Sequence, residues 1–142
     1  MIKLIIICFF LIINSCSSFK KDVVYCPKVI TPKKAAEVLV VSENNSLVYI
    51  GLRGVKTNCI KDNNDIKIEI SVNVRAIRNE TNIEDFVPVK ISVVSTDINN
   101  KEYDRDSFEY FQFLLKGSKI VDRVTTLDIN IPKNGQIFLG IR

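Results

Sequence analysis

The sequence contains no histidine and no tryptophan, and only one of its 142 residues is methionine. Histidine is the side chain that most often acts as a general base, activates a nucleophile or binds zinc, so the commonest forms of these sites are excluded. We expect no enzyme activity and no cofactor. The core has to be built from isoleucine, valine, leucine and phenylalanine.

A strong surplus of charge is also missing. Twenty Lys and Arg residues stand against sixteen Asp and Glu residues, which gives a formal net charge of +4. A nucleic-acid-binding protein needs a clustered basic face, whereas this small surplus is spread along the chain. The sequence therefore predicts no nucleic-acid partner.

An unbroken apolar run extends from Leu4 to Ile13, directly after the positive charge of Lys3. Ten helical residues span about 15 Å, which is half of the roughly 30 Å of a bilayer's hydrocarbon core. The run is too short to cross a membrane and has the length of the apolar region of a signal peptide. We predict a leader over residues 1–15.

The residues that follow, Ile13-Asn14-Ser15-Cys16, resemble the lipobox of bacterial lipoprotein precursors. That motif has an aliphatic residue three positions before a cysteine and a small residue directly before it. The resemblance implies acylation of the Cys16 thiol and cleavage between Ser15 and Cys16. Acyl chains contribute about 0.8 kcal/mol per buried methylene, so two or three of them hold a soluble domain at a bilayer. An ordinary secretory leader with a chance cysteine is the alternative.

This interpretation divides the chain into a signal peptide over 1–15, a lipidated tether over 16–25 and a domain over 26–142. The domain would lie in the cell envelope, facing the periplasm and attached to membrane lipid through acylated Cys16. In enteric bacteria a serine after the lipidated cysteine, here Ser17, favours the outer membrane over the inner membrane.

Four cysteines are present, and the leader hypothesis accounts for two of them. Cys8 leaves with the leader and Cys16 is acylated, so Cys26 and Cys59 remain as a pair in an exported protein. Disulfides form and persist in that setting, and we predict a Cys26–Cys59 bridge. A metal or redox pair is the alternative, but the sequence has neither a CxxC motif nor histidine to support it.

Most of the chain has the pattern of β-strands. Over residues 66–76 every even position is apolar and every odd position is polar, as a strand with one buried face requires. Residues 33–38 could form a helical turn after Thr31-Pro32, whereas the run 38–41 favours a strand, and we favour a strand with a short turn before it. Pro88 is expected at a strand start or edge. Further strands are predicted over 47–52, 55–60, 87–93, 108–115, 120–131 and 136–141.

Polar clusters rich in asparagine separate these segments and predict tight turns. We expect an all-β fold, namely an immunoglobulin-like β-sandwich of about seven strands, with a small β-barrel as the alternative. The clusters are at residues 44–45, 62–65, 99–100, 116–118 and 132–135.

The chain also resembles a family of uncharacterised alphaproteobacterial envelope lipoproteins. At Ile77-Arg78-Asn79 it departs from the glycine-proline turn that the family pattern would have. The resemblance implies an exported β domain and brings no activity with it. The shared features are Cys26-Pro27, Gly51-Leu52-Arg53-Gly54, Cys59, a strand that ends at Arg75-Ala76, residues 86–94 and the aromatic strand 108–113.

Two acidic clusters, Asp62-Asn63-Asn64-Asp65 and Asp104-Arg105-Asp106, lack the alternating ligands and the glycine of a calcium loop and are interpreted as hairpin turns. The aromatic residues of 103–113 are expected in the core, with a contact surface as the alternative. We expect a non-catalytic structural or interaction module with an envelope protein as partner. A protein that binds a small ligand or a glycan is the alternative.

Overall fold

The structure, a computed structural model, describes residues 24–142. The predicted leader, the cleavage site between Ser15 and Cys16 and the lipidation site at Cys16 lie outside the described residues, as does most of the tether. Among the residues that are described, no helix is long and apolar enough to cross a membrane.

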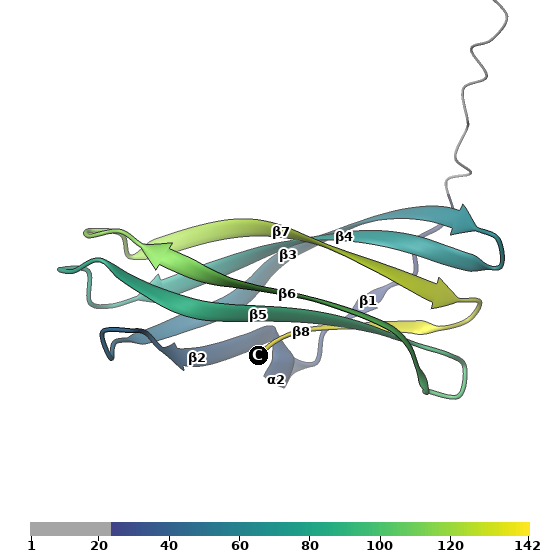
Figure 1. Ribbon diagram of the computed structural model, residues 1–142, viewed down its shortest axis with the longest axis horizontal. Helices are drawn as coiled ribbons and strands as arrows, with labels where there is room; N and C mark the ends of the chain where they lie inside the picture. The colour runs from purple at the N-terminus through teal and green to yellow at the C-terminus, as the bar shows by residue number, and fades with distance from the viewer. Residues whose placement is uncertain (1–23) are drawn as a thin grey trace, which may run out of the picture.

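Two four-stranded sheets pack face to face (Figure 1). Sheet A has the strand order β2-β3-β4-β7 and sheet B the order β1-β8-β5-β6. Neighbouring strands are antiparallel, apart from β1, which pairs parallel with β8. The elements are β1 (Val29–Ile30), α2 (Lys33–Ala36), β2 (Glu37–Val41), β3 (Leu47–Asp62), β4 (Asp65–Arg78), β5 (Asp85–Thr96), β6 (Glu102–Leu114), β7 (Ile120–Pro132) and β8 (Gln136–Ile141).

The predicted all-β sandwich is therefore confirmed. The two sheets stay separate throughout the described part of the chain, so the small-barrel alternative is wrong. The alternation in β4 is confirmed as well, because its even-numbered residues from Ile68 to Ala76 are buried between the sheets. The aliphatic side chains of both sheets interdigitate there and form one core.

Asparagine closes four of the turns. Asn45, Asn63, Asn100 and Asn134 each have a positive φ, between 53° and 63°, in the turns β2–β3, β3–β4, β5–β6 and β7–β8. Among residues other than glycine, asparagine is one of those that best tolerate this left-handed region of backbone conformation. The predicted turn clusters are confirmed at all of these positions.

Strand β3 joins two segments that the sequence analysis separated, 47–52 and 55–60. A β-bulge between Leu52 and Gly54 shifts the register against β4, so the strand continues with Arg53 as the extra residue. A short helical turn, α2, precedes β2, as expected.

Pro88 lies on an open stretch of β5. Strand β8 pairs with β5 only from Ile91 onward, so the earlier residues of β5 have no strand on that side. The neighbouring carbonyls on that side accept hydrogen bonds from the Glu43 N–H, to Phe86, and from the Arg142 N–H, to Lys90. Pro88 lies between Phe86 and Lys90 and has no N–H that would remain unpaired on this open side. Its predicted edge position is therefore confirmed.

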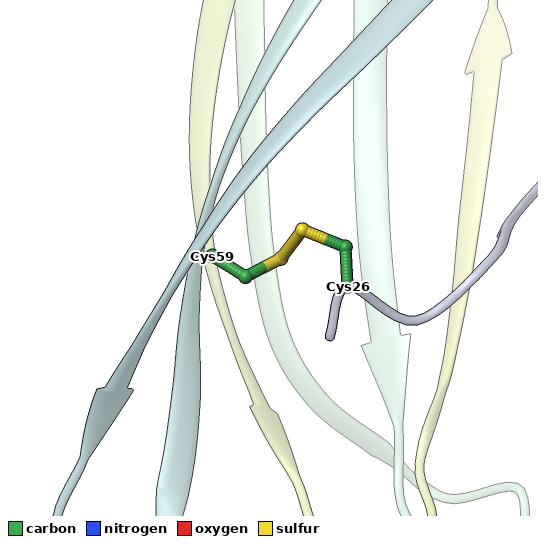
Figure 2. Close-up of a disulfide and its surroundings, with 2 residues drawn as sticks. All are labelled: Cys26 and Cys59. Atoms are coloured by element: carbon green, nitrogen blue, oxygen red, sulfur yellow. A yellow bond between two sulfur atoms is a disulfide. The ribbon is translucent and has the colours of Figure 1, made fainter. Parts of the chain in front are cut away.

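The Cys26–Cys59 disulfide is present, with the Cα atoms 5.4 Å apart. Figure 2 shows that it joins the N-terminal segment to strand β3. Cys59 is fully buried and Cys26 packs against the core. The bridge therefore fixes the start of the described chain to the sandwich.

The long axis of the sandwich has two distinct ends (Figure 1). At the proximal end lie the turns β3–β4, β5–β6 and β7–β8, and Val24, the first described residue, lies there beside Asn63 and Asn64. At the distal end lie the turns β2–β3, β4–β5 and β6–β7. The N-terminal segment therefore approaches the domain from the proximal end.

Candidate interaction surface

Four of the five aromatic residues of β6 are exposed, so their expected placement in the core is confirmed only for Tyr110, which packs against it, and is wrong for the others. Phe111 and Phe113 point outward from sheet B and are 66% and 52% exposed. Phe111 packs edge-to-face on Phe86 of β5, with 5.6 Å between the ring centroids. Strand β6 is an edge strand, and only its even-numbered positions face sheet A, which explains the difference.

A second apolar surface lies at the distal end of sheet A. Leu39, Tyr49, Ile77 and Ile120 lie opposite one another on β2, β3, β4 and β7, so they form a row across the whole sheet. A second cross-strand pair, Val41 and Leu47, extends this row toward the distal end. We call these six residues the distal apolar face: Leu39, Val41, Leu47, Tyr49, Ile77 and Ile120.

Charged residues border the distal apolar face on its proximal side. Arg53 pairs with Glu37 at 3.2 Å, and Arg75 holds Asp122 through two hydrogen bonds of 2.7 and 2.8 Å. The Tyr49 hydroxyl donates to Glu37, and this bond together with Arg53 lowers the pKa of the Glu37 carboxyl. The bidentate Arg75 contact lowers the pKa of Asp122 in the same way.

Gly51 gives Arg53 the space to reach across β3. A Cβ atom at this position would lie 3.2 Å from the Arg53 guanidinium, which folds over the glycine toward Glu37. The Gly51-Leu52-Arg53-Gly54 motif thus combines a bulge with an ion pair. An apolar centre with a rim of arginines and carboxylates is the usual composition of a protein interface.

Two buried charged residues hold the distal turns in place. Arg78, 1% exposed at the end of β4, donates from Nε to the Ser118 carbonyl and from Nη2 to the Leu115 carbonyl, at 3.0 and 2.6 Å. Asp85, at the start of β5, accepts hydrogen bonds from the Ser42 hydroxyl and from the Asn44 N–H. Arg78 thereby fixes the β6–β7 turn, and Asp85 fixes the β2–β3 turn.

The electrostatics of Asp85 follow from these contacts. Burial alone would raise the pKa of its carboxyl. The hydrogen bonds from Ser42, Phe86 and Asn44, together with the nearby Arg78 charge, outweigh burial and lower the pKa. The sequence analysis missed Arg78 and Asp85. A signal for Arg78 was available, because the alternation that buries the even-numbered residues of β4 continues to this position.

Of the two acidic clusters, one forms a turn and the other is part of a strand. Asp62-Asn63-Asn64-Asp65 is the β3–β4 turn, as predicted. Asp104-Arg105-Asp106 lies inside β6, so its interpretation as a turn is wrong. Its carboxylates reach strand β7, where Asp104 Oδ2 accepts the Asn130 N–H at 2.8 Å and Asp106 Oδ2 accepts the Asp128 N–H at 2.9 Å.

Among the hollows on the described surface are one on each sheet. One of about 450 Å³ lies along the proximal half of sheet A between Asn58 and Asp128, and its lining mixes both signs of charge. The other, of about 330 Å³, lies on sheet B and is mostly apolar. Its lining residues are Val40, Pro88, Val89, Lys90, Glu109, Tyr110, Phe111 and Arg142.

The carboxyl groups whose pKa is shifted lie outside both hollows. They are engaged instead in the ion pairs and buried contacts of Glu37, Asp85, Glu102 and Asp122. Across residues 24–142 no three Cys, Asp or Glu side chains come close enough together to hold a metal ion.

Comparisons with known proteins return no relative: no family model matches the chain, and no curated protein or solved structure is significantly similar to it. The resemblance to alphaproteobacterial envelope lipoproteins stays a prediction. What the chain can be assigned on its own evidence is an all-β, disulfide-bonded sandwich.

Proposed function

We propose that this protein is a lipid-anchored, non-catalytic interaction module of the bacterial envelope, which contacts an envelope protein through the distal apolar face. The observation that carries the proposal is the row of Leu39, Tyr49, Ile77 and Ile120 across the outer face of sheet A, with its two ends exposed and its two central residues half-buried. Ion pairs border this row. Large apolar patches with polar rims mark interaction sites on soluble proteins.

The position of this face supports the proposal. A lipid on Cys16 would hold the domain from its proximal end, and a tether from Ser17 to Tyr25 reaches at most about 30 Å. The distal apolar face lies at the other end of the long axis (Figure 1). An anchored domain would therefore direct it away from its attachment point, toward neighbouring envelope proteins.

Site-directed photo-crosslinking in intact cells tests the contact. A photoreactive amino acid at Leu39 or Leu47, which are 59% and 60% exposed, should give the same protein adduct from both positions. Ile98, 71% exposed in the β5–β6 turn, is the matched control at the proximal end and should not give it. Adducts that are absent, or equal at all three positions, would contradict the proposal.

Metabolic labelling with a fatty acid tests the anchor separately. The wild-type chain should incorporate the label and fractionate with the outer membrane. The Cys16→Ser variant should incorporate none and should accumulate with its leader attached. A native protein that is cleaved but carries no lipid would remove the anchor from the proposal and leave the contact surface intact.

A ligand-binding function is the second candidate, and the apolar hollow on sheet B favours it. The Phe111 ring and Pro88 lie beside the Lys90–Glu109 ion pair, and such an aromatic ring with flanking polar groups suits a sugar or a small amphipathic ligand. Titration with cell-wall glycan fragments, followed by amide chemical shifts, tests it. Shifts that cluster at Pro88 and Phe111 would support this function, and unchanged spectra would dismiss it.

A further inference from the structure

Strand β6 has a free edge whose hydrogen-bonding groups can be identified residue by residue. In an antiparallel ladder a residue directs both its N–H and its C=O either toward the neighbouring strand or away from it. Phe113 lies opposite Phe86, whose carbonyl accepts a bond from Glu43 on the side away from β6. The Phe86–Phe113 pair therefore directs its groups outward, and the odd-numbered residues of β6 present theirs to the free edge.

The proximal part of this edge is closed by two aspartates. Asp104 Oδ1 accepts the Arg105 N–H and Asp106 Oδ1 accepts the Ser107 N–H, both at 2.8 Å. The second oxygen of each carboxylate binds an N–H of β7. Each aspartate thus occupies one N–H on either sheet edge, and neither strand can pair with another chain there.

The distal part of the edge is open. Within the described residues, no hydrogen bond uses the N–H of Glu109, Phe111 or Phe113. The open stretch is bounded at one end by Ser107, which Asp106 caps, and at the other by Leu115, whose carbonyl accepts a bond from Arg78. An exposed, uncapped strand edge with large apolar side chains is a template for strand pairing.

We propose that residues 109–113 of β6 pair antiparallel with the same residues of a second copy of this chain, which joins two sheets B into one continuous sheet. The open stretch is symmetric about Phe111, so a two-fold axis there places Phe111 opposite itself and Glu109 opposite Phe113. Each of these pairs exchanges two hydrogen bonds. The Phe113 carbonyl, which accepts a bond from Gln112 Nε2, keeps a second lone pair for this purpose.

The side chains fit a second copy because no like charges meet. Glu109 faces Phe113, and its carboxylate is already paired with Lys90. Glu109 is the only charged side chain of the open stretch, so no carboxylate of one copy meets a carboxylate of the other across the axis. An extended peptide of another sequence would satisfy the backbone edge as well, but only a second copy places Phe111 against Phe111 by symmetry.

The geometry of the dimer follows from its axis, which is perpendicular to the sheet. The distal halves of the two copies lie side by side, and their proximal ends point in opposite directions. Both sheets A lie on the same side of the dimer, so it presents two distal apolar faces to one side. The dimer itself does not depend on the proposed envelope partner, and it would make the contact surface bivalent.

Cysteine crosslinking tests the axis. Phe111→Cys brings two thiols together across the two-fold, because Cα atoms of a directly opposed pair are about 5.5 Å apart, within the range of a disulfide. Val124→Cys on β7 is the matched control, since Val124 is also 66% exposed on an edge strand of the same side. In the full-length protein purified in detergent and oxidised, we expect about tenfold more covalent dimer from Phe111→Cys than from Val124→Cys.

A second variant keeps both phenylalanines. Glu109→Pro removes an N–H that faces the free edge, so the β5–β6 ladder is preserved while two hydrogen bonds of the dimer are lost. The wild-type chain should have the mass of a dimer and Glu109→Pro that of a monomer, with unchanged circular dichroism. A monomeric wild type, equal crosslinking from both cysteine variants, or a Phe111→Cys crosslink to another protein in place of the homodimer would each overturn the proposal.

Discussion

The proximal and distal ends of this sandwich are stabilised in different ways. The proximal end relies on asparagine-closed turns, the Cys26–Cys59 bridge and the aspartates of β6 that cap neighbouring strand edges. The distal end relies on buried Arg78 and Asp85, which connect turns far apart in sequence. It also leaves apolar side chains and an uncapped strand edge exposed.

This difference indicates that the two ends of the long axis suit different roles. At the proximal end the aspartates of β6 cap the facing edges of β6 and β7, and the disulfide fixes the chain, as the proposed attachment point would require. At the distal end the turns are held rigid from inside, so apolar side chains can remain exposed without loosening the fold. Natural proteins usually blunt exposed edges and patches, and an end that leaves them open is suited to contact with other chains.

The largest effect on stability should come from breaking the proximal fixation. Cys26→Ser removes the bridge that closes a loop with a sequence separation of 33 residues. Loop entropy predicts a loss of about 3–4 kcal/mol in the free energy of unfolding, measured by denaturant titration. Wild-type protein unfolded in the presence of a reductant should match the variant. Equal midpoints for oxidised wild type and Cys26→Ser would contradict this account of the proximal end.

Replacing Arg78 should loosen the distal end by a slightly smaller amount. Arg78→Leu leaves the buried carbonyls of Leu115 and Ser118 without their donor and should cost about 3 kcal/mol of unfolding free energy. Amide hydrogen exchange should increase mainly in the β6–β7 turn. The control is Arg123→Leu, since Arg123 is exposed and stacks on Tyr110 at 4.1 Å, and it should cost about 1 kcal/mol or less. Equal losses from both variants would remove the special role of Arg78.

The sequence predicted the strands and turns better than the contacts between segments far apart in the chain, and the reason is physical. Period-two alternation and turn asparagines are local signals, so β4 and the turns at Asn63 and Asn134 could be identified directly. The alternation of β4 places Arg78 on the buried face, but its hydrogen-bond partners are carbonyls of a turn about forty residues away, and no local pattern encodes that contact. The aromatic residues of β6 were wrongly expected in the core because apolar residues on both faces indicate burial only where a layer covers each face, and sheet B has sheet A on one side only.

Asp85 should give a smaller and pH-dependent effect. Its pKa is lower in the folded protein than in the unfolded chain, so its carboxylate stabilises the fold above the unfolded pKa of about 4. That contribution is lost as the pH falls through the folded pKa. Asp85→Asn should cost about 2 kcal/mol of unfolding free energy at pH 7, and the difference from wild type should shrink toward pH 2. A difference that stays constant from pH 7 to pH 2 would show that the charge of Asp85 has no part in holding the β2–β3 turn.

The smallest effect on stability should come from the surface with the largest proposed role in contact. Leu39→Ser and Leu47→Ser change exposed side chains, so each should alter the free energy of unfolding by about 0.5 kcal/mol or less. Both should nevertheless abolish the crosslinked adduct formed from a photoreactive residue at Ile120 on the same face. Ile98→Ser, an equally exposed change at the proximal end, should leave stability and the adduct unchanged. If Leu39→Ser instead destabilised the fold strongly while the adduct persisted, the distal apolar face would be part of the sandwich's own packing. The contrast between the two ends would then have to be attributed to Arg78 and Asp85 alone.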